Sequence, residues 1–485
     1  MTTLEWSSTR GADPATVSPA ALPVLTGVLL GAAVSWLMHR VPTDDAFITL
    51  NYARQLGLHG NWGMVDRLES NTATSPLSVL LLGGLTAVLR NAPLALAVAT
   101  TAQFAVAGYW LHGIAVRLGL GRWLFAPLAL ATLAVNPLLM SAYGLESQLA
   151  LTLLIGAGWA VVTGRAGPAG VLAGLLVLTR PDLGPSALVV LAALPARRLR
   201  AAGAAVLVTV PWFAASWWFL GSAVPDTVVI KGPESWGGTS FWNSVPHYFS
   251  ILPGPVALSV VPAVVGVVAL PWWFRERLAW VWAGAALVHY VTMSLLHPGP
   301  FFWHSTFWLC GLGLVGSAAV ARVLVSGRPV CGPVAALAGV YLLGTAWTGL
   351  NDGLPRDGFA PISFNWATPA QYEALAARLP AGTTVLSPGE IGTLAWFCEC
   401  RVVDQFADRG RFTPLLEERL ATAGPVTRTL LEANYARFER PGAVPLDLRI
   451  DTRLAPAGTP GGELTSLFTR SVRVVTVGSV PPGTP

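Results

Sequence analysis

The 485-residue sequence contains few charged side chains and a single lysine, Lys231. Asp, Glu, Lys and Arg together make up 11% of the chain, whereas 53% of the residues are hydrophobic. A soluble domain carries about a quarter charged residues, so this composition excludes an ordinary water-soluble protein. Arginine supplies nearly all the positive charge, and alanine and glycine are abundant, which is typical of GC-rich bacterial genomes.

Cysteine is also scarce. The sequence has four cysteines, which do not form the spacing pattern of a disulfide framework. Cys310 and Cys331 fall in apolar stretches, and only one residue separates Cys398 from Cys400. Such close spacing does not favour a bridge, so we expect four unreactive thiols.

Several chemical signatures are absent from the sequence. It has no His-Glu-x-x-His metal motif, no Walker-type glycine loop and no Gly-x-Ser-x-Gly elbow. An ATP-driven pump or a soluble nucleotide-sugar enzyme would need a motif of this kind. The net charge of +5 comes from arginines in short segments between apolar blocks, so we expect no nucleic-acid partner.

What the sequence does contain is a series of long apolar blocks. A helix needs about 20 apolar residues to cross a bilayer, and several blocks reach that length. Two shorter blocks, 169–179 and 183–194, are flanked or interrupted by proline and are expected to pack inside a helical bundle. The longer blocks include 22–38, 94–116, 123–140 and 149–162, with others through residue 350. The first block has no convincing cleavage site, which predicts an uncleaved signal anchor.

Arginine clusters predict how the chain crosses the membrane, because positive residues in short loops stay in the cytoplasm. Loops with such clusters alternate with loops that carry acids, prolines and histidines. If Arg117 is inside, Asn91 and Asp44 both lie outside, so the apolar run 77–89 cannot cross and is expected to be interfacial or re-entrant. The pattern gives about eleven spanning helices in the plasma membrane, with the amino terminus cytoplasmic.

Composition divides the chain into three parts. Residues 1–19 form a cytoplasmic segment, residues 20–350 a transmembrane domain with its first outer loop at 39–93, and residues 351–485 an extracytoplasmic α/β domain. In this last part we expect strands at 384–386 and 472–477, with helices at 371–378 and 414–431. The fold class is therefore a polytopic α-helical membrane protein with a C-terminal soluble α/β domain.

Two adjacent acids, Asp44 and Asp45, follow the first apolar block. A structural explanation is available, because Thr43 suits a helix N-cap and acids stabilise a first helical turn. A functional explanation is that carboxylates beside a membrane are costly unless they are used. On a helix starting at Asp44, Asn51 and Gln55 also share its face.

Other predicted outer loops carry groups suited to a lipid phosphate. Arg180 lies at the outward end of a short block and matches a phosphate with paired donors; its alternative role is a surface pair with Asp182. Lys231 is a second phosphate contact or a solvated lysine. Glu146 orients a hydroxyl or begins a helix, and His304, beside a tryptophan, contacts sugar or lipid or packs at the interface.

Five ordered motifs in these loops resemble the GT-C superfamily of integral-membrane glycosyltransferases. The closest similarity is to the actinobacterial branch that contains the arabinofuranosyltransferases of cell-wall arabinan. The motifs are Asp44-Asp45-Ala-Phe-Ile-Thr-Leu-Asn51-Tyr52-Ala, Thr74-Ser75-Pro76-Leu77, Gly144-Leu-Glu146-Ser147, Arg180-Pro181-Asp182, and Pro225-Asp226-Thr227 with Lys231. They cover about residues 20–310, and the tail matches loosely through Gly389-Glu-Ile-Gly392 and Val403-Asp404.

The resemblance implies a polyprenyl-phosphate sugar as donor and a cell-envelope glycan or lipid as acceptor. It adds Tyr52 and Asp182 to the substrate-binding candidates, and Arg54 as a substitute for the family arginine that Asn51 replaces. A divalent cation stays open as a cofactor, with no metal ligands assigned. In the predicted reaction, an inverting transfer, Asp44 is the base and Asp45 orients the acceptor.

Two other functions remain compatible with the sequence. A transporter or flippase for a lipid-linked or anionic solute would also have helices interrupted by proline and glycine. An inactive GT-C-like scaffold or sensor would explain the departures from the family motifs.

Overall fold

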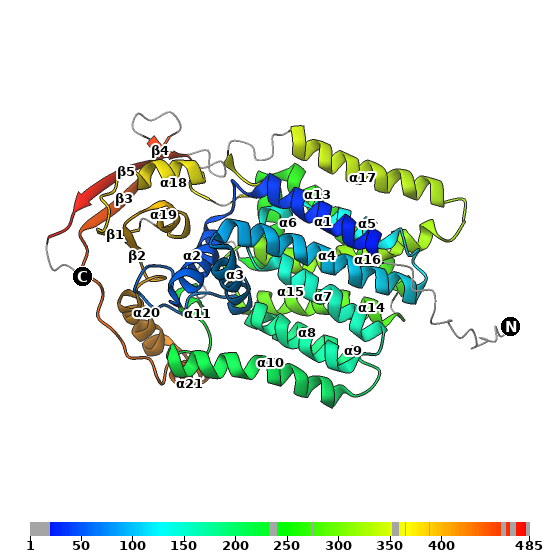
Figure 1. Cartoon of the computed structure of the whole chain (residues 1–485), viewed down its shortest axis with the longest axis horizontal. Helices are drawn as coiled ribbons and strands as arrows, with labels where there is room; N and C mark the ends of the chain where they lie inside the picture. The colour runs from blue at the N-terminus through cyan, green and yellow to red at the C-terminus, as the bar shows by residue number, and fades with distance from the viewer. Residues whose placement is uncertain are drawn as a thin grey trace.

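The computed structural model describes residues 20–231, 240–273, 275–351, 358–363, 365–387, 389–456, 462–465 and 472–481. The predicted cytoplasmic segment 1–19 lies outside these residues. Helices dominate the first 350 residues, and a sheet with four further helices follows (Figure 1). The sheet lies at one end of the long helices (Figure 1).

Seven helical stretches of the described chain are long and apolar enough to cross a membrane, so the chain is an integral membrane protein. They are α1 (Ala21–Met38), α4 (Ala92–Leu118), α10 (Arg198–Phe219), α13 (Pro253–Trp273), the run Arg277–Leu296 formed by α14 (Arg277–Ala279), η3 (Trp280–Gly284) and α15 (Ala285–Leu296), α16 (Phe302–Leu324), and Cys331–Gly349 within α17 (Cys331–Asn351). Shorter apolar helices stand between them: α3 (Pro76–Leu89), α5 (Phe125–Ala134), α7 (Ser147–Val162), α8 (Ala166–Thr179), and η1 (Pro181–Leu183) with α9 (Gly184–Ala193).

Small residues allow the long helices to pack backbone to backbone. Gly27 and Gly31 of α1 lie directly against Thr101, Phe104 and the backbone of α4, where a side chain at Gly27 would collide with the carbonyl of Phe104. Gly170 of α8 approaches the backbone of Ala201 in α10 in the same way. Close approach at small residues is the usual means of association between helices surrounded by lipid.

The apolar block 123–140, predicted as one helix, is two helices. α5 ends at Ala134, and α6 (Pro137–Ser141) begins after Asn136. The side chain of Asn136 accepts hydrogen bonds from the backbone of Leu138 and Leu139, and Pro137 occupies the first helical position, where its missing N–H costs nothing. Proline therefore interrupts the block near its C-terminal end.

Residues 39–93, predicted to be the first outer loop, fold into two helices, α2 (Asp44–His59) and α3. α2 begins at Asp44 as predicted. α3 has 14 residues, so at about 1.5 Å per residue it is roughly 21 Å long and shorter than the bilayer core. Gly57 of α2 lies against the backbone of Gly83 and Ala87 of α3, which makes the two helices one packed hairpin at the sheet end of the bundle (Figure 1).

The C-terminal part contains a five-stranded sheet in the order β2-β1-β3-β5-β4. β1 pairs in parallel with β2 and β3, whereas β5 pairs antiparallel with β3 and β4. The strands are β1 (Thr384–Leu386), β2 (Arg401–Val403), β3 (Leu448–Ala455), β4 (Gly462–Thr465) and β5 (Val472–Ser479). The helices are α18 (Pro369–Ala376), α19 (Gly392–Phe397), α20 (Arg409–Thr422) and α21 (Pro425–Asn434). The structure confirms the strands predicted at 384–386 and 472–477, and α18 confirms the helix near 371–378.

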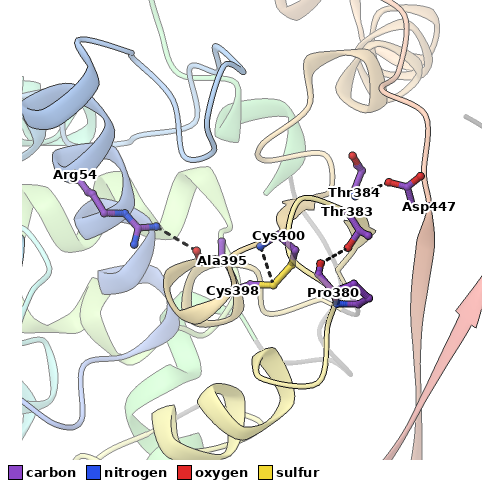
Figure 2. The surroundings of a disulfide bond; sticks show 8 residues. All are labelled: Arg54, Pro380, Thr383, Thr384, Ala395, Cys398, Cys400 and Asp447. Atoms are coloured by element: carbon purple, nitrogen blue, oxygen red, sulfur yellow. Dashed lines mark hydrogen bonds between the residues drawn. A yellow bond between two sulfur atoms is a disulfide. The ribbon is translucent and has the colours of Figure 1, made fainter.

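Two expectations for this part are wrong. The helix predicted at 414–431 is broken between α20 and α21, because Ala423 and Gly424 are extended and Pro425 starts the second helix. Cys398 and Cys400 form a disulfide rather than two free thiols (Figure 2). Cys398 leaves the end of α19 in an extended conformation, and the turn brings the two Cα atoms to 5.0 Å, which is within the bridging range.

A buried ion pair joins the C-terminal part to the bundle. Arg409 of α20 contacts both carboxylate oxygens of Asp226, at 2.9 and 3.1 Å, and also donates to Ser222 and to the backbone carbonyl of Leu220. The Asp226 side chain is fully buried. Asn71 of the first outer loop is hydrogen-bonded to Ser222 and accepts from the backbone N–H of Asp226. The Arg409–Asp226 ion pair and the hydrogen bonds around it therefore connect three segments. These are the first outer loop, the segment that follows α10, and helix α20.

Loss of the cation should be costly. Arg409→Gln leaves the Asp226 carboxylate buried without its partner, so we expect a loss of about 3 to 5 kcal/mol in the free energy of unfolding. Thermal unfolding in detergent and limited proteolysis of the C-terminal part would measure it. Arg428→Gln in α21, whose side chain bonds an exposed backbone carbonyl, is the control and should change little. Equal melting midpoints for the two variants would contradict the expectation.

Candidate functional site

The first turn of α2 is bonded to the C-terminal part of the chain. Thr43 occupies the N-cap position, but its hydroxyl makes no cap bond; instead it donates to Oδ1 of Asn365 at 2.8 Å. The same oxygen accepts the backbone N–H of Asp44 at 3.3 Å. The structural explanation of Thr43 as a capping side chain is therefore wrong, because its hydroxyl serves a contact between distant segments.

Asp44 is buried, and Thr393 supplies two donors to it. The backbone N–H and the hydroxyl of Thr393 both donate to Oδ1 of Asp44, at 2.7 and 2.9 Å. Burial raises the pKa of Asp44 to about 6, the neighbouring Asp45 adds to the rise, and the bonds from Thr393 oppose it. A carboxyl group with this pKa is mostly ionised at neutral pH and can accept a proton when a substrate releases one.

Two further buried carboxyl groups from the C-terminal part interact electrostatically with Asp44. Glu390 accepts the hydroxyl of Tyr372 at 2.7 Å and the backbone N–H of Trp366 at 2.8 Å. Burial, reinforced by Asp44, raises the pKa of Glu390 well above its ordinary value. Asp404 accepts two backbone N–H groups, and burial raises its pKa to about 7. The surroundings of Asp44 therefore favour protonated carboxyl groups.

Asp45 points to the lysine that the sequence singled out. Lys231 Nζ and Asp45 Oδ2 are 2.7 Å apart, and both side chains are about a quarter exposed, at 29% and 25%. The ammonium group also lies 5.2 Å from the ring of Phe301, 6.0 Å from that of Trp303 and 5.6 Å from that of Phe406. The ion pair thus lies in an aromatic setting that both the bundle and the C-terminal part build.

A second polar cluster lies at the C-terminal end of α8. Arg180 contacts Glu146 at 2.7 Å and Asp182 at 2.9 Å, and all three side chains are largely buried. His289 of α15 approaches Asp182 at 3.3 Å. His304 of α16 interacts electrostatically with Arg180, Asp182 and Lys231, so it is close to both this cluster and the Asp45–Lys231 pair.

Two predicted substrate-binding residues bond to protein groups instead. The hydroxyl of Tyr52 is buried between Ser70 and Thr72. Arg54 donates to the backbone carbonyl of Ala395 (Figure 2). It also donates to Asn51 and to the backbone carbonyl of Trp396, and its guanidinium stacks on the ring of Trp396. Both side chains hold α2 in place, Tyr52 against the segment between α2 and α3 and Arg54 against α19.

The sequence did not identify several residues of this region. Thr393, Glu390, Asp404 and His289 all contact predicted site residues or interact with them electrostatically. The only signals were the loose matches around Gly389–Gly392 and Val403-Asp404. Within the described ranges, no three His, Cys, Asp or Glu side chains converge as a metal-binding group; the divalent cation stays an untested prediction.

An apolar pocket lies in the bundle next to the Arg180 cluster. Side chains of α1, α3, α4, α5, α6 and α7 line it, among them Val34, Leu82, Leu96 and Leu149. Its lining also includes Tyr143, Gly144 and Leu145. These three residues directly precede Glu146, so the pocket lies beside the polar cluster.

The chain resembles solved membrane-protein structures over almost its whole length, although no protein-family model and no curated protein sequence matches it. ArnT from Cupriavidus metallidurans in the apo state gives a TM-score of 0.54 at 14% identity, over 94% of this chain and 98% of ArnT. The same protein bound to undecaprenyl phosphate gives 0.51 at 16% identity, over 94% and 97%. Arabinofuranosyltransferase AftD from Mycobacteria gives 0.52 at 16% identity, over 93% of this chain and 36% of AftD.

These similarities show that the chain has the GT-C fold. The fold expected from the resemblance to the GT-C superfamily is confirmed, and membership of the superfamily stays a prediction. Identities of 14 to 16% do not select a branch within the superfamily, so the arabinofuranosyltransferase branch stays a prediction.

Burial of Asp44 should cost stability near neutral pH. Because its pKa rises from 3.8 to about 6 on folding, protonation favours the folded state below about pH 4, and this contribution is lost as the pH rises through 6. Asp44→Asn should therefore increase the free energy of unfolding by up to about 3 kcal/mol at about pH 7.5. The melting midpoint at this pH should rise accordingly. The gain should vanish near pH 4.

The measurement is thermal unfolding in detergent at both pH values. Asp66→Asn, at an exposed acid of the same outer loop, is the matched control and should show no such gain. A gain for Asp44→Asn that is the same at both pH values would show that ionisation is not its cause.

Proposed function

We propose that this protein is a polyprenyl-phosphate-dependent glycosyltransferase that acts on the outer face of the membrane. The observation that carries the proposal is the Asp44–Asp45 pair at the start of α2, with Lys231 on Asp45, within a GT-C fold. The similar ArnT structure holds undecaprenyl phosphate, and AftD is an arabinofuranosyltransferase. Both facts support a lipid-phosphate donor and a transfer reaction for this chain.

Asp44 is the general base of the proposed reaction. It accepts the proton of the acceptor hydroxyl while that oxygen attacks the anomeric carbon, and the bond from this carbon to the phosphate oxygen breaks with inversion. A base works best when its pKa is near the working pH, and a pKa of about 6 meets this condition. Asp45 holds Lys231 and orients the acceptor.

Lys231 and Arg180 receive the leaving polyprenyl phosphate. Each is paired with carboxylates, Lys231 with Asp45 and Arg180 with Glu146 and Asp182. The donor phosphate therefore replaces a carboxylate as the partner of each cation. The positive charge of the cation is compensated both before and after the lipid binds. His304 interacts electrostatically with both cations, and in this reaction it contacts the phosphate or the sugar.

The apolar pocket beside Glu146 suits the isoprenoid chain of the donor. Its lining is mostly aliphatic, and α3 forms one side of it. A re-entrant α3 would leave this side open to the outer leaflet, so the lipid could enter without its chain leaving the bilayer.

The membrane topology follows the arginine pattern. Seven long helical stretches and four of the shorter apolar ones, with α3 left out, give about eleven crossings. The amino terminus is then cytoplasmic in the plasma membrane, and residues 351–485 form an extracytoplasmic domain. The acceptor in this arrangement is a cell-envelope glycan or lipid, and the sugar is arabinofuranose, mannose or a similar residue, as in the actinobacterial branch.

Replacement of the base should abolish transfer. Asp44→Asn keeps the shape of the side chain but cannot take the proton, so we expect the rate to fall at least 100-fold, as is typical of a lost general base. The assay gives membranes a radiolabelled polyprenyl-phosphate sugar and follows label into acceptor. Asp66→Asn is the control at equal protein levels. Transfer retained in Asp44→Asn would exclude this role, and label moved across the bilayer without transfer would support the flippase.

Loss of the lysine should mainly weaken use of the donor. Lys231→Gln removes a charge-assisted phosphate contact, so we expect kcat/KM for the lipid donor to fall roughly 10- to 100-fold. Lys231→Arg should retain part of the activity. Arg67→Gln, at an exposed arginine of the first outer loop, is the control. An unchanged kcat/KM in Lys231→Gln would assign the lysine a purely structural role.

A further inference from the structure

Asp44 is held by a segment far from it in the sequence. Thr393 lies 349 residues further along the chain, yet its backbone N–H and its hydroxyl both bond Oδ1 of Asp44. The two residues are 1% and 8% exposed. Neither donor belongs to α2, so the conformation of the carboxylate depends on the docking of α19.

The fit between α19 and α2 leaves no room for adjustment. Gly392 lies directly against the backbone of Asp44 and Ile48, where any side chain would collide with the Asp44 carbonyl. The side chain of Asn51 donates to the carbonyl of Gly392 at 2.9 Å. Because Gly392 precedes Thr393, these contacts fix the position from which both donors reach Asp44.

The charges around Asp44 make the donors important. Asp45 on its own helix, Glu390 before α19, Tyr372 of α18 and Asp404 after β2 interact electrostatically with Asp44. Asp44 helps to raise the pKa of Glu390 and of Asp404, whereas burial and the charge of Asp45 favour the protonated form of Asp44. In the described part of the chain, the hydroxyl of Thr393 is the side-chain donor that opposes them.

We propose that Thr393 is a positioning residue, whose hydroxyl keeps the Asp44 carboxylate ionised and oriented, so that docking of the C-terminal part completes the active site. Only the description of Asp44 as the base rests on the proposed function. The coupling between Thr393 and the charge of Asp44 is independent of it. The C-terminal part thereby acts within the catalytic centre and is more than a platform for the acceptor.

A double-mutant cycle tests the coupling without any substrate. Thr393→Val removes the hydroxyl and keeps the shape, and the lost bond is stronger when it serves a carboxylate than a carboxylic acid. We expect the melting midpoint of the full chain in detergent to fall by roughly 2 to 4 °C more at about pH 8 than at about pH 5. In an Asp44→Asn background the difference between the two pH values should disappear.

Two further variants make the cycle specific. Thr393→Ser keeps the hydroxyl and should behave as the wild type at both pH values. Thr413→Val makes the same chemical change in α20, where the hydroxyl bonds a backbone carbonyl, and its effect should not depend on pH. An effect of Thr393→Val that is equal at both pH values, or that persists in Asp44→Asn, would overturn the coupling.

The pH profile of transfer separates positioning from a purely structural role. With a radiolabelled polyprenyl-phosphate arabinofuranose as donor, the rising limb of activity should shift upward by roughly half to one pH unit in Thr393→Val and return in Thr393→Ser. If the double-mutant cycle shows coupling but the rising limb of the pH–activity profile does not shift in Thr393→Val, the positioning role is overturned. If the wild type transfers no sugar from any donor, the proposed function fails, and the cycle alone decides whether Thr393 controls the charge of Asp44.

Discussion

A carboxylate in a protein interior has to be hydrogen-bonded or neutralised, and in this chain that requirement falls on Asp44. Its Oδ1 is bonded by Thr393, its backbone N–H by Asn365, and the neighbouring hydroxyl of Thr43 by the same asparagine. These bonds all reach from the C-terminal part to the first turn of α2. The contacts that compensate a buried charge are therefore the contacts that dock the two halves of the molecule.

Several charged side chains of this region are paired with side chains of opposite charge. Lys231 is paired with Asp45, Arg180 with Glu146 and Asp182, and the buried Asp226 of the anchor with Arg409. A partly buried cation without a counter-ion would pay a desolvation penalty before any ligand arrives. Carboxylates that fill the anion positions in the free protein avoid this penalty, and they make binding of an anion an exchange of partners.

The sequence predicted local features well where periodicity or charge carried the signal. The start of α2, the short α3 and strands β1 and β5 of the C-terminal sheet depend on patterns within a few residues, and loop composition alone was enough to select Glu146, Arg180 and Lys231. The errors arose at Pro137 and Pro425, where a proline with a suitable residue before it starts a new helix inside an apparently continuous one. The hydrophobic periodicity of the sequence does not reveal such a break between two helices.

The part of the site that sequence reasoning missed comes from contacts across the chain. Nothing local marks Thr393, because a threonine in an apolar helix start is unremarkable until Asp44 is placed beside it. The same holds for Arg54, which has the charge expected of a phosphate ligand but faces carbonyl groups at the end of α19. Only the docking of two segments about 340 residues apart distinguishes these roles.

The bridge between Cys398 and Cys400 bears on the side of the membrane where this docking takes place. Thiols in the cytoplasm are kept reduced by glutathione and thioredoxin, whereas disulfides persist where oxidants prevail. The bridge follows α19 directly, next to the carbonyls that hold Arg54 (Figure 2). The redox state of this bridge therefore indicates on which side of the membrane α19 lies, and with it Asp44. This indicator is independent of the arginine pattern and of helix lengths.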